Sequence, residues 1–170
     1  MFAQDTTNST IKFSYSANDI FKKAARASAF SARGMRDKEG NSMFEDYSLT
    51  EDEIDIFEQG LESILPDIYG KILKLMPDID SEHESSSEVV FTIRDNGAYN
   101  KNALILVDKS FEECLVDGSL MAWYKNCLNA DLFELYSQSF NGCLEKLYNR
   151  MFQLKLKKTV SMLGQIKEGA

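Results

Sequence analysis

The sequence predicts a mainly α-helical fold: an antiparallel bundle of four to five helices, with a short strand or hairpin and extended terminal arms. Apolar residues recur at spacings of three and four in four stretches of the chain, which is the period of a helix with one buried face. Strict alternation, the period of a half-buried strand, is confined to residues 10–15 and 88–95. The linker before the last helical stretch is short, so the two helices that it joins are expected to pack antiparallel.

Length and composition limit the class of protein. The chain has 170 residues, enough for one domain with its own core, and its hydrophobic fraction of 44% is ordinary for a globular protein. The longest aliphatic run, residues 103–107, is far below the about 20 residues of a membrane-spanning helix, so no membrane contact is expected. Residues 1–5 lack the basic and apolar regions of a secretory signal, and we expect synthesis in the cytoplasm.

The N-terminal part is predicted as an extended arm over residues 1–16, in which residues 10–15 are either a short strand or part of the arm, followed by a helix. Ile11, Phe13 and Tyr15 share one side of the extended segment. Asn18 or Asp19 can cap the helix, which carries many small residues and ends at Gly34. Residues 34–49 are charged and turn-rich, so they are predicted as an exposed loop.

The next helix begins at a capping box, Thr50–Glu53, in which the Glu53 side chain reaches back to Thr50. Its apolar stripe includes Phe57 and Leu61. Pro66 removes a backbone hydrogen bond and clashes with the preceding turn, so a kink or break is predicted near Ile64. Residues 77–87 are predicted as a solvated linker.

The second half of the chain is predicted as a strand, Glu88–Asp95, and two long helices. Asn-Gly at 96–97 is a hairpin signal, so residues 103–107 can be read as a returning strand. A helical stripe over the same residues favours a helix from about 101 to 127, with Gly118 as a close-packing point. The last helix restarts at Asn129 or Asp131 and holds one apolar face to Leu154. The predicted core is Phe57, Leu61, Phe91, Phe111, Leu115, Trp123, Tyr136, Phe140 and Leu147.

The charge of the chain is unevenly distributed. Its net charge is −8, yet residues 41–88 hold 14 acids against Lys71 and Lys74, which is −12. From Glu145 to Glu168 six cations face two acids, which is +4, and residues 155–170 are predicted as a basic arm. Such polarity suits head-to-tail contacts between copies or a basic arm on an acidic partner, although ordinary solvated helix faces explain it equally well.

The sequence offers no recognisable catalytic or cofactor motif, so we expect no enzyme activity, no cofactor and no metal. There is no phosphate-binding loop, dinucleotide fingerprint, zinc-protease motif or nucleophile elbow. Cys114, Cys127 and Cys143 form no CxxC pair, and His83 is the single histidine. We expect the cysteines to be buried reduced thiols.

The aromatic residues allow two readings. Either they fill the core, or some of them anchor contacts between subunits, where Tyr and Phe are enriched. The residues predicted for such contacts, together with nearby cations, are Phe13, Tyr15, Tyr148, Phe152, Lys155, Lys157 and Lys158.

The order of motifs resembles the head–tail connector (adaptor or head-completion) proteins of tailed bacteriophages and of prophages in Bacteroides-like bacteria. The resemblance spans residues 11–154. Its parts are the helix Ile20–Ala27, the acidic start Leu49–Glu53, the strand Val89–Arg94, the segments 111–116 and 120–124 around Trp123, and the helix Leu132–Phe152.

The resemblance implies a structural virion protein at the head–tail interface. Residues 17–154 would form a connector domain that assembles with other copies into a ring, commonly twelve-fold, under the portal protein. The ring would extend the DNA channel without binding DNA specifically and would join tail proteins, and the terminal arms would reach neighbouring proteins. The alternative is a small cytoplasmic adaptor or regulatory protein that binds a partner through an apolar groove near Trp123.

Overall fold

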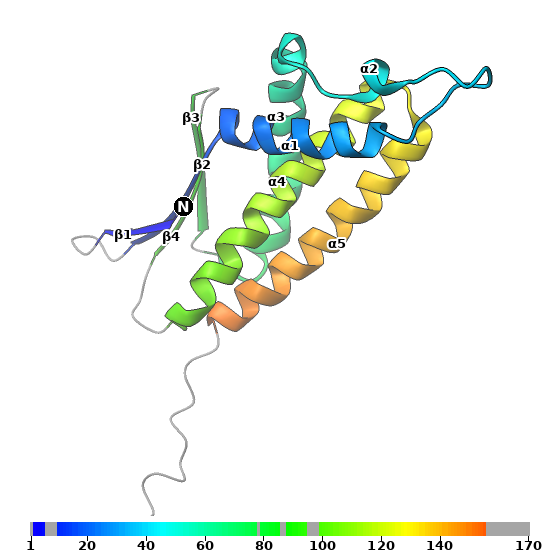
Figure 1. Cartoon of the computed structure of the whole chain (residues 1–170). Helices are drawn as coiled ribbons and strands as arrows, with labels where there is room; N and C mark the ends of the chain where they lie inside the picture. The colour runs from blue at the N-terminus through cyan, green and yellow to red at the C-terminus, as the bar shows by residue number, and fades with distance from the viewer. Residues whose placement is uncertain (1, 6–9, 78, 86–87, 95–98, 156–170) are drawn as a thin grey trace, which may run out of the picture.

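The computed structural model describes residues 2–5, 10–77, 79–85, 88–94 and 99–155 (Figure 1). The chain is mainly helical, and a small antiparallel sheet packs beside the helices. The helical elements are α1 (Ala17–Ala32), α2 (Phe44–Tyr47), α3 (Ile54–Leu73), α4 (Leu104–Asn126) and α5 (Ala130–Lys155), with short 3₁₀ turns at Glu51–Glu53 and Lys101–Ala103. The predicted predominance of helix and the four long helices are therefore confirmed.

The sheet has four strands in the order β1-β2-β4-β3, all antiparallel. The strands are β1 (Phe2–Asp5), β2 (Thr10–Ser16), β3 (Ile79–Ser85) and β4 (Glu88–Arg94). In the pairing of β2 with β4, Phe13 lies opposite Phe91 and Tyr15 opposite Val89. Because side chains alternate along a strand, these residues share the face that packs on the helices.

Phe111 of α4 joins the sheet to the helices. Its ring stacks on Phe91 with centroids 4.4 Å apart and lies 5.1 Å from the Phe13 ring. Tyr15 completes this cluster at 6.2 Å from Phe111. Offset aromatic pairs of this kind contribute about 0.5–1.5 kcal/mol each beyond the area that they bury. All nine residues predicted for the core are buried.

α4 and α5 form the main helical pair and run antiparallel along their length (Figure 1). α3 packs on α4, and the absence of a side chain at Gly118 permits close approach: a Cβ built there would lie 2.6 Å from Ile64 Cδ1 and 2.8 Å from Phe140 Cε2. The helix predicted from about 101 to 127 is confirmed, and residues 103–107 do not form a returning strand.

The capping box at Thr50 and Glu53 is confirmed, and it does more than begin α3. Glu53 Oε2 accepts from the Thr50 N–H at 3.0 Å, while Glu53 Oε1 accepts from the indole Nε1 of Trp123 at 3.1 Å. One carboxylate therefore starts a helix and satisfies the single polar atom of a side chain that is 1% exposed.

Expectations about three irregular segments are wrong in whole or in part. Of the two readings of residues 10–15, the short strand is confirmed: β2 lies between β1 and β4, so these residues are not a free arm, and Phe13 and Tyr15 are buried there and cannot contact another subunit. The predicted linker 77–87 contains the edge strand β3. Of the kink or break predicted near Ile64, the break is absent, since α3 is continuous from Ile54 to Leu73 with Pro66 inside it.

The predicted exposed loop 34–49 is buried at its end. Leu49 lies in the core, and its N–H donates to the Ser28 hydroxyl of α1 at 2.9 Å. Tyr124 donates its hydroxyl to the carbonyl of Tyr47 at 3.1 Å. Ser28, the single polar residue among the buried residues of α1, thus accepts from the buried backbone amide of Leu49, which would otherwise lack a partner.

Candidate functional site

The titratable groups with the largest pKa changes lie inside the core. Burial and the neighbouring Asp108 raise the pKa of the Tyr15 phenol, whose hydroxyl donates to Asp108 Oδ1 at 2.9 Å. A hydrogen bond with Cys143, together with burial, raises the pKa of the Cys114 thiol. Because the thiolate is the nucleophilic form, a raised pKa makes Cys114 unreactive. These groups act as neutral packing elements.

The three cysteines are free thiols, with Cys114 buried and Cys127 and Cys143 half-buried. Among the residues that the structure describes, no group of three or more His, Cys, Asp or Glu is placed to hold a metal ion.

A shallow groove of about 380 Å³ lies between α3 and α5, and we call it the α3–α5 groove. It is lined by Pro66, Asp67, Gly70, Lys71 and Lys74 of α3 and by Phe140, Asn141 and Leu144 of α5. The space beside Gly70 is open, because a Cβ built at this position would meet nothing within 4 Å. The lining is mixed: it combines apolar side chains with two lysines and with the polar side chains of Asp67 and Asn141.

An apolar stripe of α5 continues from the groove toward the C-terminal end of the helix. Leu144, Tyr148 and Phe152 are spaced by four residues and therefore lie on one face. Lys71 pairs with Glu145, and its ammonium lies 5.7 Å from the centroid of the Tyr148 ring. Phe152 at the end of the stripe is 48% exposed.

Lys155 ties the end of α5 to the end of α3, because its ammonium donates to the carbonyl of Leu75 at 2.8 Å. Of the residues predicted for subunit contacts, Tyr148, Phe152 and Lys155 thus come together on the last turns of α5. Phe13 and Tyr15 do not, and Lys157 and Lys158 lie outside the described residues.

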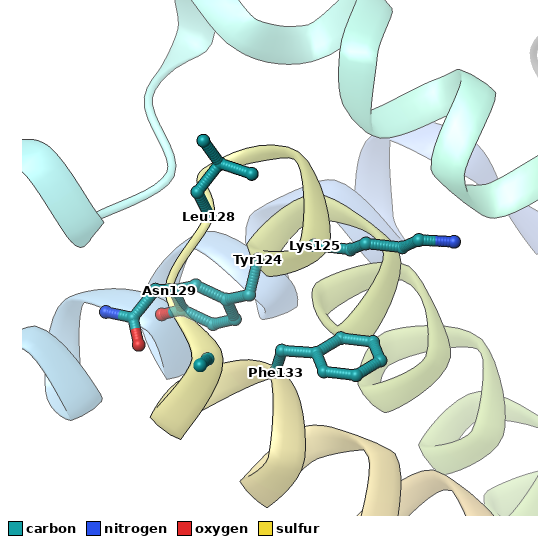
Figure 2. Close-up of a pocket in the computed structure, with 6 residues that line it drawn as sticks. Tyr124, Lys125, Leu128, Asn129 and Phe133 are labelled. Carbon is teal, nitrogen blue, oxygen red and sulfur yellow. The ribbon is translucent and has the colours of Figure 1, made fainter.

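A second pocket, of about 220 Å³, lies at the turn between α4 and α5 (Figure 2). We call it the α4–α5 turn pocket; it is lined by Tyr124, Lys125, Leu128, Asn129, Ala130 and Phe133. Leu128 points away from both helices in Figure 2 and is 91% exposed. Its φ of 55° lies in the left-handed region that favours glycine.

Hydrogen bonds fix this turn. The Asn129 N–H donates to the carbonyl of Tyr124 at 3.3 Å, which is the long bond of a helix C-cap, and Asn129 Oδ1 accepts from the Leu132 N–H at 2.9 Å, which caps α5. The predicted Asn129 cap is therefore present. Sequence reasoning missed Leu128. The signal was an apolar residue at the position just before the N-cap Asn129, because glycine is usual where a helix ends.

The charge along α3 changes sign. From residue 51 to residue 62 there are six carboxylates and no cation, namely Glu51, Asp52, Glu53, Asp55, Glu58 and Glu62. The other half of the helix holds Lys71 and Lys74 against Asp67. At 1.5 Å per residue, the two ends are roughly 30 Å apart. One helix thus carries an acidic end and a weakly basic end.

Neither the protein-family models, nor the curated proteins, nor the solved structures contain a match to this chain. The resemblance to head–tail connectors therefore stays a prediction. No helix within the described ranges combines the length and the apolar character needed to cross a membrane.

Proposed function

We propose that this chain is a structural subunit that binds other polypeptides, and that it serves in the head–tail connector of a tailed bacteriophage. The observation that carries the proposal is the α3–α5 groove with its continuing stripe, Leu144, Tyr148 and Phe152. Aromatic side chains beside a groove suit a protein partner, since Tyr and Phe are enriched where subunits meet.

In this role, copies of the chain form a ring, commonly twelve-fold, that docks under the portal protein, extends the DNA channel and joins the tail. A ring is built from heterologous contacts, in which one surface of a subunit meets a different surface of the next. The acidic and basic ends of α3 supply such unlike surfaces. A net charge of −8 also disfavours tight binding of the DNA that passes through, because few cations are available to replace counterions.

The proposal is tested by light scattering after size exclusion and by electron microscopy of the full chain, alone and with the portal protein of the same phage genome. We expect an oligomer of more than two copies, or a ring that forms when the portal is added. Phe152→Glu should abolish assembly. Phe30→Glu is the matched control, because Phe30 is exposed on α1, outside the groove and the stripe. A chain that is monomeric with and without the portal refutes the proposal.

The α4–α5 turn pocket supports a second candidate function, that of a small cytoplasmic adaptor. Trp123 itself is buried, so a partner would contact the residues that follow it, chiefly Leu128 and Phe133. An adaptor of this kind is a stable monomer or dimer. In that case Leu128→Ser weakens the binding of the partner, while Phe152→Glu leaves it unchanged. The mass measurement above separates the two functions.

A further inference from the structure

We propose that the α3–α5 groove of one copy binds the first turns of α3 of a second copy, with Ile56 in the groove and Asp52 and Asp55 against Lys71 and Lys74. This inference rests on the proposed function, since it names the two surfaces through which copies meet.

The groove offers the basic half of the contact. Lys74 is exposed and makes no ion pair with any residue in the part of the chain that the structure describes. Lys71 pairs with Glu145, and the Glu145 side chain is 64% exposed, so this pair is open to exchange for a partner carboxylate. Asp67 lies one turn before Lys71, which places the positive end of the groove toward the end of α3.

The apolar side chains that line the groove give the contact its second component. Phe140 and Leu144 line it from α5, and Pro66 lines it from α3. An occupant therefore has to combine carboxylates with one exposed aliphatic side chain on the same face. A polypeptide with acidic groups alone would leave these apolar side chains uncovered.

The first turns of α3 carry that combination. Asp52, Asp55, Ile56 and Gln59 are spaced so that they share one exposed face of the helix and its 3₁₀ start. Ile56 is 43% exposed, a large apolar side chain among carboxylates. Glu53 is not part of this face, because its carboxylate is engaged by Thr50 and Trp123.

The contact has to form between copies. Both surfaces lie along one straight element, α3 with its 3₁₀ start, and their centres are separated by roughly 20 Å, so the acidic turns cannot fold back into their own groove. Because the two surfaces differ, a pair of docked copies still has one free groove and one free set of acidic turns. Further copies can therefore add, and the contact propagates into a ring or a filament. Complementary charge fixes the direction in which the copies add.

Charge reversal on each side gives a test with an internal control. Lys71→Glu with Lys74→Glu makes both surfaces acidic, and Asp52→Lys with Asp55→Lys makes both basic. Each variant alone should require at least about a tenfold higher concentration for half-association than the unmodified chain, because like charges are brought together. An equimolar mixture of the two should assemble again, since every contact between unlike variants then joins opposite charges.

The control is Lys12→Glu with Lys22→Glu, which changes the net charge by the same amount at exposed positions away from the groove and should assemble normally. Far-ultraviolet circular dichroism of each variant verifies the fold. The inference is overturned if either charge-reversal variant assembles normally, or if the mixture fails to assemble although both chains are folded. Both results leave the proposed function intact. A monomeric unmodified chain overturns the proposed function, and the inference with it.

Discussion

The close approach of α3 and α5 to α4 at Gly118 leads to a quantitative prediction. In Gly118→Ala the new Cβ would lie 2.6 Å from Ile64 Cδ1 and 2.8 and 2.9 Å from two ring carbons of Phe140. Carbon atoms prefer separations of about 3.5–4.0 Å, so both side chains have to move by up to about 1 Å inside a packed core. Overpacking of this kind typically costs about 1–3 kcal/mol.

The gain in helix propensity opposes this cost and has to be subtracted. Replacing glycine by alanine inside a helix stabilises the helix by about 1 kcal/mol. Gly142 in α5 is the matched control, because a Cβ built there meets nothing within 4 Å. Gly142→Ala should therefore stabilise the protein by about 1 kcal/mol. The difference in unfolding free energy between the two variants isolates the packing cost, about 1–3 kcal/mol.

Urea unfolding followed by the fluorescence of the single tryptophan, Trp123, measures both variants. Far-ultraviolet circular dichroism should give the same midpoints if the chain unfolds in one step. Equal stabilities for Gly118→Ala and Gly142→Ala would refute the reasoning, because they would mean that α3, α4 and α5 are not in close contact at Gly118.

Three further variants test other features by the same unfolding measurement. Leu128→Gly should stabilise the fold by about 1 kcal/mol, because it removes the strain of a left-handed residue that buries almost nothing, and a loss of stability would contradict this. Ser119→Ala should leave stability unchanged or raise it by about 1 kcal/mol, since the buried Ser119 hydroxyl has no hydrogen-bond partner among the described residues, and a clear loss would reveal an undetected partner. Glu53→Ala should cost about 2–4 kcal/mol, because it removes a helix cap and leaves the Trp123 N–H without an acceptor. In a double-mutant cycle with Trp123→Phe, the two losses should be less than additive by about 1 kcal/mol, and full additivity would argue against the indole hydrogen bond.

The helices could be predicted from the sequence because their signals are local. The capping box and the stripe of α5 each depend on residues within a few turns of one another. A helix also reports its buried face through its own periodicity, whichever neighbour covers it.

The alternating strands at residues 10–15 and 88–95 could be predicted, but their pairing with each other could not, because it is non-local. β2 finds its partner about 80 residues later in β4, and alternation in Ile11, Phe13 and Tyr15 is the same whether a strand pairs within the chain or docks elsewhere. The sequence of the edge strand β3 is mostly polar and shows no alternation of apolar residues. The strand joins the sheet through backbone pairing with β4.

One part of the candidate site could be predicted from local sequence, and the other part could not. Tyr148, Phe152 and Lys155 could be selected from α5 alone. The other wall of the groove, Pro66 to Lys74, depends on how α3 lies against α5, and one helix does not encode the register of its neighbour. Pro66 was expected to interrupt α3; instead it forms part of this wall.

The inner position of β2 has a practical consequence for handling the protein. A fragment that starts after residue 16 would lack a middle strand of the sheet, and the stacked rings of Phe91 and Phe111 would lose their neighbour Phe13 and meet water. During synthesis the sheet cannot close until β4 has left the ribosome, so β2 lacks this partner while α1 and α3 form. Fusion partners and trimmed versions for expression should therefore preserve the beginning of the chain.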